Sequence, residues 1–120
     1  MGMFNSIYAD LRCPTKQEVG SDIEIQIKWQ TRESRVLAVY RLGDVLEDLE
    51  PEYDNTWIRT DYICPVCSQH TIGKHGIRYI KTEDQRWHLV FVRTEKGKIC
   101  EILTEDEFEK TGVTNFVQYR

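Results

Sequence analysis

The pair Cys64 and Cys67, in the sequence CPVC, has the spacing of a metal-binding turn. Two intervening residues let both thiolate sulfurs approach one ion at about 2.3 Å without strain. Pro65 fixes its own φ angle and removes one backbone N–H from the turn. Zinc is a soft-ligand metal that thiolates select, and it is the one we expect here. The sequence therefore predicts a structural zinc site of the kind called a zinc knuckle.

The remaining ligands must come from other parts of the chain, because a structural zinc site has four. Cys13 begins the sequence CPTK, which starts like a second knuckle but has Lys16 where its second cysteine would stand. We expect Cys13 to be the third ligand. For the fourth we choose His75, which precedes a glycine at the end of a hairpin-sized loop, with His70 as the alternative.

Two other residues with ligand chemistry, His88 and Cys100, fall in the centres of expected strands. Histidine and cysteine at such positions are more often packed in the protein than bound to a metal. We therefore leave both residues out of the predicted site.

A redox-active dithiol is the main chemical alternative for the CPVC pair. Thioredoxin-like sites place the two cysteines at the start of a helix, whereas the following sequence, SQHTIGKHG, contains two glycines and lacks helical periodicity. Catalytic zinc needs an open coordination position and usually a nearby general base. The chain has no His-Glu-X-X-His motif and no histidine before His70. We expect a non-enzymatic protein with no catalytic residues and no small-molecule substrate.

Strands must carry this site, because the clearest periodicity in the chain is two. In DIEIQIKWQ, residues 22–30, isoleucines and Trp29 alternate strictly with polar residues, which predicts a strand with one face in water. Other runs rich in β-branched and aromatic residues predict further strands. They lie at 5–12, 35–42, 56–63, 76–82, 86–94 and 96–103, with a last edge strand at 113–120.

One short C-terminal helix is expected within TEDEFEKTG, residues 104–112. Thr104 and Glu107 have the spacing of a capping box. Acidic residues fill the first turn, where the helix dipole favours them, and Gly112 ends the helix. The predicted fold is mainly β, a β-rich α+β class, with an antiparallel sheet, a zinc-ribbon-like CxxC knuckle and this helix.

Length and composition set the class of protein. The chain has 120 residues, 40% hydrophobic and 30% charged, which suits one folded domain over 1–120 with its knuckle at 64–67. No apolar run approaches the ~20 residues of a membrane span, and the N-terminus does not have the pattern of a secretory signal. We expect a cytoplasmic protein with no membrane contact.

Charge is distributed unevenly along the chain. The net charge is −4, made of −5 over residues 1–63, +4 over 64–100 and −3 over 101–120. The basic segment 74–98 offers an alternative function in nucleic-acid binding, with phosphate contacts and with Tyr79 or Trp87 available for stacking. The candidate phosphate-binding residues are Lys74, Arg78, Lys81, Arg86 and Arg93. A pI near 5.4 weighs against this alternative.

Four stretches carry a resemblance to a known family: MGMFNSIYADLRCP, IQIKWQTRES, YRLGDVL and YICPVC. Over residues 1–68 the chain resembles small "MGMF" proteins of phages and prophages. Many of these proteins look like zinc ribbons with two knuckles and no assigned activity. The resemblance implies a phage or bacterial origin and the cytoplasm of a bacterial host cell. The function that we expect is that of a non-enzymatic, zinc-ribbon-like binding module with a protein partner. Lys16 and the long tail after residue 76 depart from the family pattern.

Overall fold

The computed structural model describes residues 5–27, 39–46, 49 and 51–118. Several sequence-based expectations therefore concern residues outside the described ones. They are the MGMF opening, Trp29 with the end of its strand, the first residues of the strand expected at 35–42, and the last two residues of the chain.

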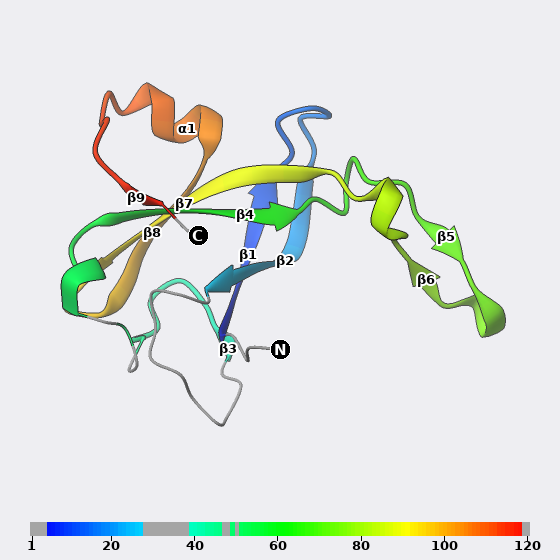
Figure 1. Ribbon diagram of the computed structural model, residues 1–120, viewed down its shortest axis with the longest axis horizontal. Helices are drawn as coiled ribbons and strands as arrows, with labels where there is room; N and C mark the ends of the chain where they lie inside the picture. The colour runs from blue at the N-terminus through cyan, green and yellow to red at the C-terminus, as the bar shows by residue number, and fades with distance from the viewer. Residues whose placement is uncertain (1–4, 28–38, 47–48, 50, 119–120) are drawn as a thin grey trace.

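The described residues form nine strands, three short 3₁₀ turns and one α-helix (Figure 1). The strands are β1 (Asn5–Arg12), β2 (Val19–Ile27), β3 (Val39–Tyr40), β4 (Trp57–Ile63), β5 (Thr71–Ile72), β6 (Arg78–Tyr79), β7 (Trp87–Glu95), β8 (Lys98–Thr104) and β9 (Val117–Gln118). The helix α1 is Glu105–Lys110, and the 3₁₀ turns are η1 (Pro51–Tyr53), η2 (Lys74–Gly76) and η3 (Thr82–Asp84).

Two sheets and one separate hairpin account for these strands. The first sheet has the order β2-β1-β3, the second has the order β8-β7-β4-β9, and β5 pairs only with β6. The long neighbours are antiparallel, while the short edge pairs β1–β3 and β4–β9 are parallel. The prediction of a mainly β, largely antiparallel fold with one short C-terminal helix is confirmed.

The core lies between the two sheets. Ile23 and Ile25 of β2 are 2% and 0% exposed, while Glu24 between them is exposed, as the alternation predicts for a strand with one wet face. Ile58 of β4 and Val92 of β7 belong to the same buried cluster. The sheets are therefore joined by apolar burial along the strands that lead to the predicted knuckle.

Helix α1 covers the other face of β7. The capping box is confirmed, because Thr104 accepts a bond from the Glu107 N–H and Glu107 accepts one from the Thr104 N–H at 3.0 Å. Phe108 stacks on Phe91 with ring centroids 3.8 Å apart, and Trp57 meets Phe108 edge-on. No helix in the described part of the chain is long and apolar enough to cross a membrane.

Replacing Phe108 with alanine is expected to lower the free energy of unfolding by about 3 kcal/mol, because it empties a buried aromatic contact. Phe108 is 4% exposed and is the one buried residue of the six in α1, so it is the main contact of this helix with the sheet. Urea unfolding monitored by tryptophan fluorescence measures the change. Glu109→Ala, at an exposed position of the same helix, should change it by less than about 0.5 kcal/mol. A loss below 1 kcal/mol for Phe108→Ala would show that α1 is not held by this stack.

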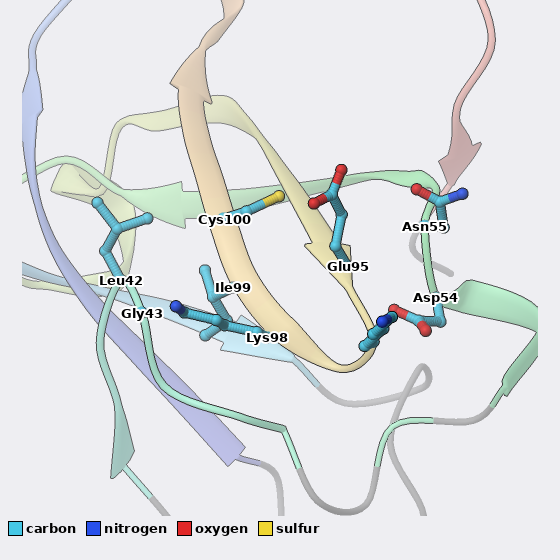
Figure 2. Close-up of a pocket in the computed structure, with 9 residues that line it drawn as sticks. Leu42, Gly43, Asp54, Asn55, Glu95, Lys98, Ile99 and Cys100 are labelled. Atoms are coloured by element: carbon cyan, nitrogen blue, oxygen red, sulfur yellow. The ribbon is translucent and has the colours of Figure 1, made fainter.

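A depression of about 800 Å³ opens beside the β7–β8 turn, and Asp54 lies at its edge (Figure 2). The Asp54 carboxylate accepts bonds from the Gly97 N–H at 2.9 Å and the Thr94 hydroxyl at 2.8 Å. The bond from Gly97, and to a smaller extent the bond from Thr94, lower the pKa of Asp54 below its ordinary value of 3.8. Lys96 has a φ angle of 53° in this turn, a conformation that residues other than glycine rarely adopt, and the carboxylate stabilises the turn that requires it. The residue therefore has a structural role.

Replacing Asp54 with asparagine is expected to lower the free energy of unfolding by about 1 kcal/mol at neutral pH, because bonds to a charged acceptor are weakened. The lowered pKa means that this stabilisation is complete above the unfolded-state value near 3.8 and is lost as pH falls through the folded-state value. Denaturation of both proteins at neutral and acid pH tests this, with Glu52→Gln as the control in an exposed position. If the difference in free energy of unfolding between wild type and Asp54→Asn became larger at acid pH, the prediction would be contradicted.

Candidate metal centre

Three strand ends bring the candidate ligands together. Cys13 directly follows β1, Cys64 directly follows β4, and His88 is the second residue of β7. The antiparallel register pairs Tyr62 with His88, so the start of β7 lies beside the end of β4. The ligand atoms of Cys13, Cys64, Cys67 and His88 all lie within 4.8 Å of one another. The cluster therefore joins the first sheet to the second.

The turn at Cys13 has the backbone pattern of a knuckle although its second cysteine is missing. The Lys16 N–H points at the Cys13 sulfur, with N and S 3.4 Å apart, and the Gln17 N–H donates to the Cys13 carbonyl at 2.8 Å. An N–H aimed at sulfur stabilises the thiolate form. The sequence CPTK thus presents one sulfur inward, while the exposed Lys16 side chain lies at the surface.

The CPVC turn is fixed from both sides. The Ser68 N–H donates to the Cys64 carbonyl at 3.1 Å, which closes the turn. The Ser68 hydroxyl accepts from the Arg86 N–H at 2.9 Å, and the Cys64 N–H donates to the Arg86 carbonyl at 2.8 Å. Gly20 of β2 allows close approach on another side, because a Cβ there would lie 2.9 Å from Val66. The knuckle is therefore packed against β2 and bonded to the chain that precedes His88.

The separations suit a tetrahedral ion. With sulfur at about 2.3 Å and nitrogen at about 2.0–2.1 Å from zinc, tetrahedral angles place ligand atoms roughly 3.5–3.8 Å apart. The His88 Nε2 lies 3.2 Å from the Cys67 sulfur and 3.8 Å from the Cys13 sulfur. These two distances lie on either side of the separation expected for nitrogen and sulfur ligands, and all four ligand atoms lie within 4.8 Å of one another. The cluster therefore has the ligand set of a Cys₃His zinc site and is compact enough to surround one ion.

The electrostatics of the cluster favour a bound cation. Burial, followed by the neighbouring thiols of Cys64 and Cys13, raises the pKa of Cys67 to about 12. For Cys13 burial acts in the same direction, but the N–H groups of Lys16 and Thr15 and the two other thiols outweigh it and lower its pKa. Ionisation of the Cys67 thiol is therefore favoured by a positive charge nearby, which offsets burial and the neighbouring thiols. A divalent metal supplies that charge.

Tyr62 lies beside the cluster, with its ring centroid 6.0 Å from that of His88. Its side chain is 1% exposed, and its hydroxyl is the one buried side-chain polar atom that lacks a partner among the described residues. Burial, followed by charge on Cys64, Cys13 and Cys67, raises its pKa.

The structure corrects the choice of the fourth ligand. His75 lies in η2 with a φ angle of 64°, exposed at the tip of the β5–β6 hairpin and outside the cluster. The Nε2–H of His70 donates to the Pro65 carbonyl at 2.8 Å, so this residue supports the knuckle backbone. Cys100, which donates to the Arg93 carbonyl, also lies outside the cluster. His88 takes the place expected for His75 or His70.

The sequence did contain a signal for His88. In WHLVFV, His88 shares its side of the strand with Val90 and Val92, and both valines are fully buried. A histidine on the inward face of a central strand requires a polar partner. The cysteine cluster is that partner. A position in the centre of a strand was therefore the wrong reason to exclude His88 from the site.

Four of the five basic residues considered for nucleic-acid binding lie on the β5–β6 hairpin or at its base, and the fifth lies on β7. Lys74 belongs to η2 and Arg78 to β6, and Lys81 follows that hairpin. Arg86 bonds at the base of the same hairpin, beside the knuckle. Arg93 lies on β7 and pairs with Glu95 at 3.1 Å and Glu101 at 3.7 Å. Arg93 therefore differs from the other four, because two carboxylates already lie beside its guanidinium.

Comparison with known proteins identifies no relative: no family model, no curated protein and no solved structure matches this chain. The site is therefore classified by its own ligand set. Three cysteines and one histidine, drawn from three strand ends, define a candidate Cys₃His metal centre.

Proposed function

We propose that this protein is a non-enzymatic, zinc-stabilised binding module in which the metal has a structural role. The observation that carries the proposal is the closed set of Cys13, Cys64, Cys67 and His88, whose ligand atoms all lie within 4.8 Å of one another. Four protein ligands complete a tetrahedral zinc site, whereas catalytic zinc keeps one position open for water or substrate. The same ligand set favours zinc over metals that prefer oxygen ligands.

The position of the site supports a structural role. Cys13 extends the first sheet, while Cys64 and His88 belong to adjacent strands of the second. One ion bound by these residues would cross-link the two sheets at the end of the shared core. Structural zinc contributes directly to folding, with apparent binding free energies of about 10–16 kcal/mol in zinc-finger peptides. In this chain an apolar core already joins the sheets, so the metal adds local rigidity.

The setting that we propose is a bacterial cytoplasm, in a phage- or prophage-encoded protein with a protein or nucleic-acid partner. Its support is the resemblance of residues 1–68 to the small MGMF proteins. A reducing cytoplasm also suits the four free cysteines of the chain, because thiols there stay available to metals.

Cobalt substitution tests the proposed site. Co²⁺ added to metal-free protein is expected to give the intense visible absorption of tetrahedral cobalt bound to thiolates, with saturation at one ion per chain. Zinc should displace the cobalt and abolish the bands. Weak bands of an octahedral cobalt ion, or no saturation at one equivalent, would contradict a closed Cys₃His site.

A further inference from the structure

The hairpin formed by β5 and β6 stands away from both sheets (Figure 1). We call residues 69–81 the arm. It leaves the body after the knuckle and returns toward β7, so Cys67 precedes it and His88 follows it. The Ser68–Arg86 and Cys64–Arg86 hydrogen bonds join the two sides of its base. A metal ion bound by Cys67 and His88 would join the two sides of this base at a second point.

The charge of the arm is opposite to that of the remaining chain. It contains Lys74, Arg78 and Lys81 and no carboxylate. The whole chain carries −4, so the residues outside these three cations carry −7. All three cations are exposed, and within the described ranges none forms an ion pair. A polyanion would therefore be attracted to the arm and repelled by the acidic remainder.

The arm also presents an aromatic surface. Tyr79 is 46% exposed, and its ring lies against Gly73, where a Cβ would be 3.0 Å from a ring carbon. The pairing of Thr71 with Tyr79 fixes the strand that carries this ring. At the base of the arm Trp87 is 50% exposed. Exposed aromatic rings beside cations are the means by which proteins stack the bases of single strands.

An unoccupied arm of this kind is poorly stabilised. A two-stranded hairpin is marginal in water when it packs on nothing, and here the pairing covers two residues on each strand. Ile72 and Ile77 are 72% and 64% exposed. These features favour an arm that becomes covered when a partner binds, while the metal centre holds its base.

We propose that the arm binds single-stranded nucleic acid, with Lys74, Arg78 and Lys81 on phosphates and a base stacked on Tyr79. The proposal rests on the proposed function, because the metal centre is what fixes the base of the arm. A single strand is favoured over a duplex since its bases are free to stack on an exposed ring. The proposed nucleic-acid-binding surface is therefore the arm alone and not the whole basic segment 74–98.

Fluorescence anisotropy with a labelled oligothymidylate of about 16 nucleotides tests this at low salt. The triple variant Lys74→Gln/Arg78→Gln/Lys81→Gln should bind at least tenfold more weakly. It should also reduce the slope of log affinity against log salt concentration by about 2, from three lost phosphate contacts. Tyr79→Ala should weaken binding about tenfold. The matched control is Lys96→Gln/Lys98→Gln/Lys110→Gln, which makes the same charge change outside the arm and should bind like wild type.

Zinc content measured on the same samples separates the proposed zinc site from the proposed nucleic-acid binding by the arm. Arm variants that keep one zinc and lose affinity support the arm as the interface. Zinc-loaded wild type that does not bind at low salt overturns it and leaves the metal centre intact. Equal losses in the control variant overturn it too, since binding would then follow net charge alone. A wild-type dimer that the arm variants convert to monomer, without oligonucleotide binding, would assign the arm to a protein partner.

Discussion

His88→Ala is expected to abolish tight zinc binding, although sequence patterns point to a different histidine. The substitution removes the only nitrogen ligand of the cluster and leaves three crowded thiols, two of them buried, without a complete set of ligands around the ion. Loss of a metal ligand should weaken zinc affinity by at least 100-fold, since even changes in residues behind the ligands cost about 10–100-fold. Competition with a chromophoric zinc chelator measures the affinity of each variant.

Two further histidines provide the control for this result. His75→Ala changes an exposed residue at the tip of the arm, and His70→Ala removes only a bond to the Pro65 carbonyl. His75→Ala should bind zinc like wild type, and His70→Ala should lose less than tenfold. His88→Cys should restore tight binding, because four cysteines also form a structural zinc site. Equal losses in His75→Ala and His88→Ala would show that the cluster is not the binding site.

Cys13→Ser is expected to lower the free energy of unfolding by about 4 kcal/mol in zinc-containing buffer. A metal at 1,000 times its dissociation constant contributes about that amount to the folded state, and Cys13 is the ligand that links the first sheet to the second. Removal of zinc from the wild type with a strong chelator should lower its stability equally. Denaturant unfolding with and without added zinc measures both changes.

Cys100→Ser is the matched control, because this cysteine lies outside the cluster and its sulfur, among the described residues, bonds only to Arg93. It should keep the zinc-dependent part of the stability. In metal-free wild type, the amide protons of Cys64 and Arg86 should exchange faster, since they join the base of the arm. If zinc changed neither stability nor exchange, the ion would have no structural role in this protein.

Local sequence signals predicted most of the elements because each depends on neighbouring residues. The alternation around Ile23 and Ile25 predicted a strand with one buried face, and both side chains are buried. Thr104 and Glu107 predicted the start of α1 through a capping box that the structure contains. The CPVC spacing likewise predicted a turn that directs two sulfurs toward one point.

The fourth ligand could not be obtained from local signals, because it depends on strand register. His88 reaches the knuckle only since β4 and β7 pair so that Tyr62 lies opposite it. Nothing near Cys67 in the sequence specifies this pairing. His75 is closer along the chain, but it lies in η2 on the arm and outside the cluster. Proximity in sequence therefore favoured the wrong residue.

X-ray absorption at the zinc edge of the purified protein tests the central claim most directly, because it reports the atoms bound to the metal. A Cys₃His centre predicts three sulfurs at about 2.3 Å and one nitrogen at about 2.0–2.1 Å, with no bound water. The same spectrum for His88→Cys should show four sulfurs. A wild-type spectrum with two sulfurs and several oxygen or nitrogen neighbours, or a purified protein that holds no zinc, would contradict the claim.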